Sequence, residues 1–158
     1  MRKLFALALI NLGGCATVGT GATSNRAADY VRLAASSDAY EIESSRLALQ
    51  RSRDPWVRAH ATLMIRDHGY TSAQLASAAA EQGIAVPAGM MPMQAAMMRT
   101  LEGSASFDAT YRQQQIDVHR QALALHDRYA RRGDRPALRG VAAVAVPLER
   151  SHLDHLRP

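Results

Sequence analysis

The sequence predicts an all-α fold, an antiparallel four-helix bundle, and three observations lead to this prediction. Aromatic residues make up only 5% of the 158 residues, whereas β-sandwiches and barrels are rich in aromatic and β-branched side chains. Apolar residues recur at intervals of three and four in four long segments, and no segment of the sequence alternates over any length. Short connections between these segments favour antiparallel neighbours. Because 47% of the residues are apolar and 21% are charged, the composition excludes wholesale disorder.

The first two helices are expected over residues 26–53 and from Pro55 to Gly83. One face of the first helix carries Val31, Ala35, Asp38, Ile42, Ser45 and Leu49. Asp54 and Pro55 mark the start of the second helix, since aspartate is a preferred N-cap and proline suits the first helical position. The inward row of the second helix is Val57, Ala61, Met64, His68, Thr71, Leu75 and Ala78.

A short extra helix and two more long helices follow. Prolines and glycines predict a loop over residues 83–92, and a short helix is expected over 93–101, before Gly103. The third long helix begins after Ser104 or Ser106 and ends at Gly133; its inward row is Phe107, Tyr111, Val118, Ala122, Leu125 and Tyr129. The fourth follows Asp134, with Leu138, Val141, Ala145, Leu148, His152 and Leu156 facing inward. Pro147 is expected to kink or restart this helix.

The N-terminal residues are typical of an export signal. Arg2 and Lys3 precede an apolar run that is too short to span a bilayer as a permanent helix. The run ends in Leu12-Gly13-Gly14-Cys15, which resembles a bacterial lipobox, and Cys15 is the only cysteine in the chain. We therefore predict a lipoprotein signal peptide over residues 1–14, a lipidated Cys15 with a flexible tether over 15–25, and a helical domain over 26–158. Lipidation would hold the protein on a membrane without a spanning helix.

The formal charge of +5 does not indicate a nucleic-acid partner. The only lysine is Lys3, and removing the predicted signal leaves 17 arginines against 14 acidic residues, which is +3. The arginines are scattered, and the densest group, over residues 128–135, falls at the end of a predicted helix, where cations face the last carbonyl groups. The sequence contains no basic stripe with interleaved aromatic residues. Nucleic acid is therefore excluded as a partner.

Several short motifs resemble a known bacterial family. They are Ala39-Tyr40-Glu41-Ile42-Glu43, Met64 to His68, Gly103 to Asp108, Tyr111 with His119, and Pro147 with His152-Leu153. Together they resemble the exported family known as domain of unknown function 4142, over residues 25–155. The resemblance implies a ferritin-like helical bundle and a place in the cell envelope, facing the periplasm. It implies no activity.

Polar residues indicate a candidate metal layer in the middle of the bundle. Glu149 and His152 have the Glu-x-x-His spacing of ferritin-like iron sites, which puts both side chains on one helix face. Counting from the helix ends places Glu41 (or Asp38), His68 and His119 at a similar height. Candidate metal ligands are therefore Glu41, His68, His119, Glu149 and His152, for a transition metal such as Fe, Zn or Cu.

Other spacings argue against a full di-iron site. Asp67 and His68 are adjacent, and Asp117 lies two residues before His119, so neither pair shares one helix face. The favoured interpretation is that the histidines are buried polar groups that tie helices together through Asp67, Tyr111 or backbone partners. A mononuclear His-dominated site is the alternative. We also expect the His60 side chain to be solvated. His126 lies seven residues after His119 on the same side of its helix, so we expect it to extend the row of inward polar residues.

Two further features bear on function. Five methionines lie at Met90, Met91, Met93, Met97 and Met98; thioethers favour Cu(I), but packing or a partner groove is the favoured interpretation. Neither a nucleophile motif nor a phosphate-binding glycine loop is present in the sequence.

The leading prediction is a lipid-anchored envelope bundle that acts as an interaction or stress-related module without catalysis, and Ala16 favours the outer membrane. The alternative is a metal-binding or redox protein.

Overall fold

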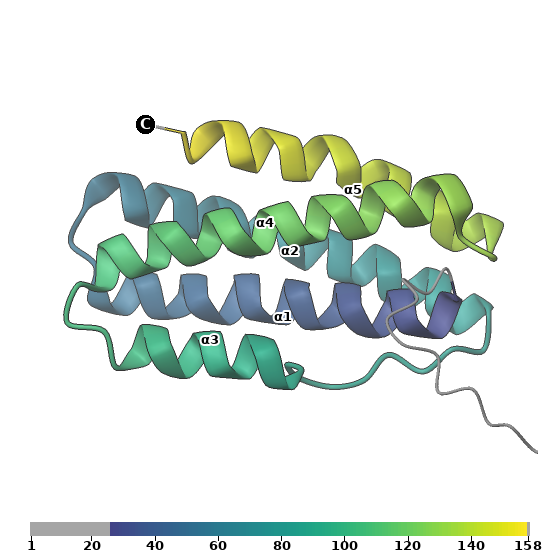
Figure 1. Cartoon of the computed structure of the whole chain (residues 1–158), viewed down its shortest axis with the longest axis horizontal. Coiled ribbons are helices and arrows are strands. Elements are labelled where there is room, and N and C mark those ends of the chain that lie inside the picture. The colour runs from purple at the N-terminus through teal and green to yellow at the C-terminus, as the bar shows by residue number, and fades with distance from the viewer. Residues whose placement is uncertain (1–25, 158) are drawn as a thin grey trace, which may run out of the picture.

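The computed structural model describes residues 26–157, which form five α-helices and no strand. The helices are α1 (Ala27–Arg51), α2 (Pro55–Glu81), α3 (Pro92–Glu102), α4 (Phe107–Arg132) and α5 (Pro136–His155). The all-α prediction is confirmed, with four long helices and a short one between the second and third of them (Figure 1). The predicted signal peptide, Cys15 and the tether lie outside the described residues.

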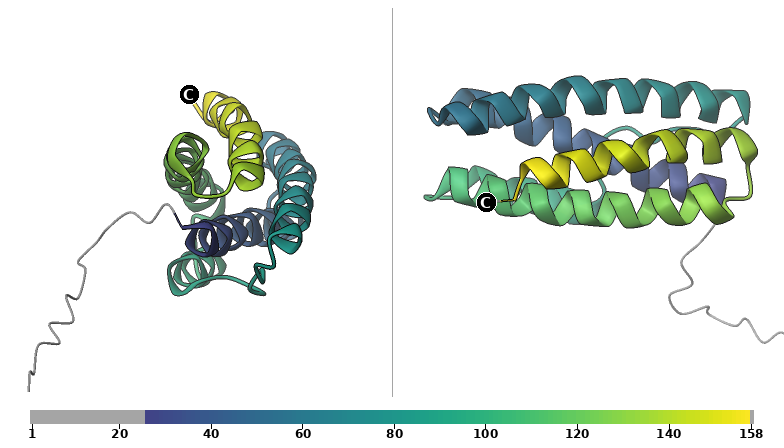
Figure 2. Two further views of the ribbon diagram at one scale, coloured as in Figure 1. Left: turned by 90° about the vertical axis from the view of Figure 1, so that its right-hand side faces the viewer. Right: turned by 90° about the horizontal axis from the view of Figure 1, so that it is seen from above.

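The four long helices form a bundle in which one connection is a long crossover. In the bundle α1 packs against α2 and α4, and α5 packs against α4 and α2 (Figure 2). Residues 82–91 and α3 lead the chain back along the bundle, so that α2 and α4 run in the same direction, while packed neighbours among the four long helices are antiparallel (Figure 1). A single long crossover of this kind is the ferritin-like arrangement. None of the helices in the described part has the length and apolarity needed to cross a membrane.

Local sequence signals explain where the helices begin. The Asp54 side chain accepts a hydrogen bond from the backbone N–H of Val57 at 2.9 Å, as the predicted N-cap requires. Pro147 lies inside α5, which continues from Pro136 to His155, so the predicted restart is wrong. The side chain of Pro147 is exposed, and a solvent-facing proline costs the helix one hydrogen bond without blocking its packing.

Apolar clusters fill the two ends of the bundle. One cluster holds Tyr30, Leu75, Tyr129 and Leu138, and the other holds Val57, Leu101, Phe107 and Tyr111. Between them the buried side chains are mostly polar: Asp38, Glu41, His68, Gln115, His119, Glu149 and His152. Because burying polar groups costs free energy unless they find partners, the two apolar ends must support this polar middle layer.

One end of the bundle yields a stability prediction. The Tyr129 ring stacks on Tyr30 with centroids 3.9 Å apart, and its hydroxyl donates to Asp134 at 2.9 Å. A Cβ atom on Gly133 would lie 2.5 Å from this ring. Since the ring is held on both sides, we expect Gly133→Ala to lower the free energy of unfolding by about 1–3 kcal/mol. Urea unfolding measures this loss.

The control for this substitution is Gly140→Ala. Gly140 lies within α5, and an added Cβ would meet nothing within 4 Å. This variant should be neutral or stabilised by up to about 1 kcal/mol, because alanine is a better helix former than glycine. Equal unfolding free energies for the two variants would contradict the packing described for Tyr129.

Candidate metal centre

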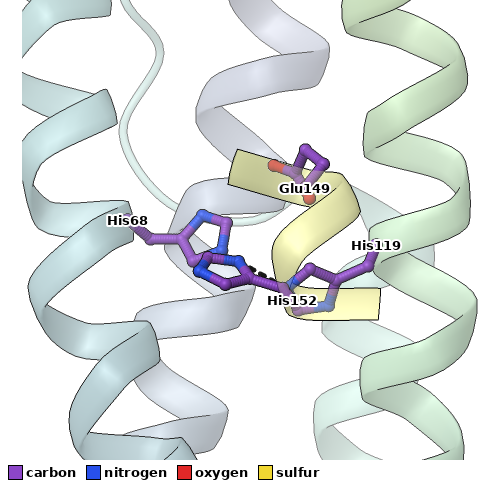
Figure 3. A group of neighbouring side chains, drawn as sticks. All are labelled: His68, His119, Glu149 and His152. Carbon is purple, nitrogen blue, oxygen red and sulfur yellow. Dashed lines mark hydrogen bonds between the residues drawn. The ribbon is translucent and has the colours of Figure 1, made fainter. Parts of the chain in front are cut away.

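Four side chains from three helices meet in the polar middle layer. They are His68 from α2, His119 from α4, and Glu149 and His152 from α5 (Figure 3). Each offers one ligand atom, and these four atoms all lie within 4.8 Å of one another. Each of the four residues is at most 1% exposed. The group, called the His/Glu cluster below, contains four of the five ligands predicted from the sequence.

Glu41, the fifth predicted ligand, lies beside this cluster. Its Oε1 is 3.4 Å from Nδ1 of His119, and its side chain is fully buried. Neither carboxyl oxygen has a hydrogen-bond partner among the described residues. Burial raises the pKa of Glu41 to about 8, although His68 opposes the shift. The structure therefore places Glu41 behind His119, next to the cluster.

Each imidazole of the cluster has one nitrogen held by an oxygen outside it. His68 Nδ1 lies 2.8 Å from the Asp38 carboxylate on α1. His119 Nδ1 lies 2.7 Å from the Gln115 carbonyl, and His152 Nε2 lies 3.0 Å from the Asp67 carboxylate on α2. Because carbonyl and carboxylate oxygens accept hydrogen bonds, these three nitrogens carry the protons. Such outer partners fix the ring orientation of metal-binding histidines in proteins.

In its neutral form, each imidazole presents the lone pair of its other nitrogen to the cluster. Nε2 of His119 lies 3.1 Å from Nδ1 of His152, so two lone pairs face each other at hydrogen-bonding distance. Nε2 of His68 is buried and has no hydrogen-bond partner among the described residues, and the same is true of Oε2 of Glu149. A cation between these atoms would satisfy all of them at once.

The protonation of the cluster is set by burial and by the carboxylates nearby. Burial lowers the pKa of His152 to about 4 against the opposing effect of Asp67, and it puts the pKa of His119 well below its usual value. For His68, burial is outweighed by Asp38 and Glu41, and the pKa rises to about 9. Burial raises the pKa of Glu149 to about 7. His119 and His152 are therefore neutral at pH 7, the form that binds metals, whereas His68 must release a proton when it binds one.

The structure corrects two predictions about residues near the cluster. His60 is only 5% exposed, so the expectation that it is solvated is wrong; it stacks on Trp56 and lies 3.3 Å from Oε1 of Gln115. His60 lies next to Ala61, and the inward face of a packed helix is wider than a single row of residues. This width is the signal that would have indicated the burial of His60. Tyr111 does not contact the cluster histidines and instead bonds Ser45 at 2.8 Å. The predicted pairing of Asp67 with a histidine is present, since Asp67 contacts His152. Nε2 of His126 lies 3.9 Å from Oε1 of Glu149, so His126 extends the row of buried polar residues as predicted.

The methionine group does not form part of this centre. Sδ of Met91 accepts a hydrogen bond from Arg32 at 3.1 Å, and Met93 is 49% exposed. Met93 lines a groove with Leu33 and Leu125. These contacts fit the packing interpretation of the methionines.

The fold and this centre together define a four-helix bundle with a buried cluster of three imidazoles and a carboxylate. The chain belongs to the family described as domain of unknown function (DUF4142), which matches residues 15–158. No curated protein matches the sequence.

Solved structures of CopM share the fold. CopM in its Cu(II)-bound form aligns with a TM-score of 0.71 and 18% identity, covering 83% of this chain and 93% of CopM. The Cu(I)-bound form aligns at 0.70 and 16%, covering 83% and 92%. The apo form aligns at 0.69 and 16%, covering 83% and 93%. At these identities the likeness establishes the all-α bundle.

Proposed function

We propose that this protein binds one transition-metal ion in the middle of its bundle. His68, His119, His152 and Glu149 would hold the ion, with Asp38, the Gln115 carbonyl and Asp67 orienting the three imidazoles. The observation that carries the proposal is the arrangement of each imidazole, with its outer nitrogen bonded to an oxygen and its inner nitrogen turned toward the cluster. Such pairs are the usual support of histidine ligands.

The distances in the cluster suit a single ion. Metal–nitrogen bonds of about 2.0–2.1 Å in a tetrahedron place ligand atoms about 3.3–3.4 Å apart. The His119–His152 separation of 3.1 Å is close to that edge, and the upper limit of 4.8 Å requires ligand shifts of about 1 Å. The cluster contains one carboxylate, whereas ferritin-like di-iron sites use four. A mononuclear centre is therefore the better match.

Copper is the first choice of metal. Imidazole ligands suit Zn, Cu, Fe and Ni, so the ligand set alone does not select among them. CopM, whose bundle resembles this one, has been solved in Cu(II)-, Cu(I)- and Ag-bound forms. This likeness supports copper binding or a copper-dependent redox role in the cell envelope. It favours the metal-binding alternative over the leading sequence-based interpretation, an interaction module without metal.

The contacts of the histidines also favour a structural role as the second candidate. The pair His68–Asp38 joins α2 to α1, and His152–Asp67 joins α5 to α2. His119–His152 joins α4 to α5 when one of the two facing nitrogens carries a proton. These contacts would hold the four long helices together even without a metal.

Metal analysis of the purified full chain separates the two functions. After loading with Cu(II) and removal of free ion, we expect one copper per chain, and the variants His68→Ala and His152→Ala should retain less than about a tenth of it. His155→Ala is the control, because His155 is exposed on α5 and lies outside the cluster. Equal copper in the wild type and the two cluster variants would leave only the structural role.

We also propose that the chain is anchored in the envelope through Cys15, facing the periplasm from the outer membrane. The lipobox-like Leu12-Gly13-Gly14-Cys15 supports this. Mass spectrometry of the protein from its native host should find an acylated N-terminal Cys15, and Cys15→Ser should move the protein from the membrane to the soluble fraction. An unmodified Cys15 on a soluble chain would contradict the anchor.

A further inference from the structure

The His/Glu cluster is closed to solvent, so an ion must reach it through the wall of the bundle. This inference rests on the proposed function and asks by which route the ion arrives. The four cluster residues are 0–1% exposed. A route therefore needs a surface groove whose floor contacts a cluster residue directly, and a side chain there that attracts a cation.

The groove between α2 and α5 has both properties. It has a volume of about 330 Å³ and is lined by Arg66, Asp67, Tyr70, Thr71, Val144 and Leu148. Asp67 lies at the cluster side of this groove, where its Oδ2 is 3.0 Å from Nε2 of His152. Its side chain is 13% exposed, against 1% for His152. One carboxylate thus separates solvent in this groove from a cluster imidazole.

A second contact connects the same groove to His68. The Thr71 hydroxyl donates to Oδ1 of Asp38 at 3.2 Å, and this oxygen lies 2.8 Å from Nδ1 of His68. Outer partners of two of the three imidazoles are therefore reached from one groove.

Asp67 already holds a cation on its outer side. Nε of Arg66 donates to Oδ1 of Asp67 at 2.7 Å, and the Arg66 side chain is 72% exposed. The guanidinium is free to swing into water, because surface ion pairs are weak. Carboxylate oxygen is also a ligand for divalent metal ions. Arg66 and an incoming cation would therefore compete for one carboxylate.

We propose that the α2–α5 groove is the route by which a divalent metal cation reaches the His/Glu cluster. Asp67 is the residue that captures the cation, and Arg66 is the competing positive charge that it displaces. His152, which contacts Asp67 through Nε2 and His119 through Nδ1, joins this carboxylate to the cluster.

The groove between α1 and α2 provides a comparison. It is lined in part by Ser72 and Val86, and Ser72 donates to Asp38 rather than to a cluster imidazole. Two side chains therefore separate this groove from the cluster. Val86 is 38% exposed there and Val144 is 49% exposed in the α2–α5 groove, so the same substitution can be made in both.

Stopped-flow mixing of the full chain with Cu(II) tests the route. A dye whose absorbance changes when it binds free Cu(II) reports uptake by the protein, and a competing chelator gives the release rate, so tryptophans introduced by substitution do not disturb the readout. A change confined to a route alters association and dissociation rates by the same factor and leaves Kd unchanged. Arg66→Gln should raise both rates about threefold to tenfold, because it removes a repulsive charge. Val144→Trp should lower both by more than about tenfold.

Two matched variants serve as controls. Arg131→Gln breaks the 2.7 Å pair of Arg131 with Asp127, on the exposed face of α4, and Val86→Trp fills the α1–α2 groove. Both should leave the rates within about twofold.

Asp67→Asn removes the charge that captures the cation and should slow association more than tenfold. Asp127→Asn is its matched control.

The outcomes separate the route from the function. If the wild type binds no Cu(II) at equilibrium, the proposed function fails and the route fails with it. If the wild type binds but Val86→Trp slows it and Val144→Trp does not, only the route is overturned. A changed Kd for Arg66→Gln with an unchanged association rate would also overturn it, since that result places Arg66 in support of the bound ion.

Discussion

Replacing Glu149 by methionine should stabilise the metal-free chain by about 1–3 kcal/mol and weaken metal binding more than tenfold. Glu149 is buried, and its Oε2 has no hydrogen-bond partner among the described residues. A buried polar atom without a partner costs about that much. Methionine has a similar volume and no such atom, so the substitution removes the cost and one proposed ligand together. Urea unfolding of the metal-free protein and a Cu(II) competition titration measure the two effects.

The control for this substitution is Glu43→Met on the exposed face of α1, where Glu43 pairs with Arg46. Its free energy of unfolding should change by less than about 0.5 kcal/mol. If Glu149→Met instead destabilised the metal-free protein, the carboxyl group would be a structural partner of its neighbours, such as His126, and its role as a free ligand would be wrong.

Metal binding should raise the thermal stability of the full chain by a large amount. A ligand that binds only the folded state at about 1,000 times its Kd adds about 4.1 kcal/mol. For a domain of this size that corresponds to a rise in Tm of about 8–16 °C. Calorimetry with and without Cu(II) measures the rise, and a chelator should reverse it.

His152→Ala distinguishes this centre from other copper sites. It removes one imidazole of the cluster, and we expect it to abolish the rise in Tm. If the variant kept the full rise, copper would be binding elsewhere, and the methionines over residues 90–98 would be the next site to test.

The four-helix fold could be predicted because its signals are local. Spacings of three and four, the Asp54 cap and the Pro55 start all act within one or two turns, and each is present in the structure. The crossover between α2 and α4 follows from the loop and short helix that the sequence places there. Its direction along the bundle depends on contacts of α3 with α1 and α4, which no local pattern contains.

The inward face of α5 could be predicted only in part. The expected row included Val141 and Leu148, but the buried residues at those turns are Ala142 and Glu149. An apolar pattern assigns the core to valine and leucine. In α5 the buried residue is instead Glu149. Burying its carboxylate costs free energy, and only its polar neighbours in the middle layer explain why the position is tolerated. Such local conflicts are expected where a site is built.

Which residues form the cluster was easier to predict than which contacts they make with one another. Counting residues from helix ends gives the height of His68, His119 and Glu149, because an α-helix rises by about 1.5 Å per residue. It does not give side-chain rotation. That Asp38 orients His68 and that Glu41 lies behind His119 depend on rotamers set by packing across helices.

X-ray absorption at the copper edge of the loaded full chain tests the central proposal most directly. We expect the copper to be bound by three imidazole nitrogens and one carboxylate oxygen at bond lengths of about 2.0–2.2 Å, as Zn–N and Zn–O bonds measure. We also expect part of the imidazole scattering to be lost in His119→Ala. A first shell dominated by sulfur, or a spectrum unchanged in His119→Ala, would contradict it.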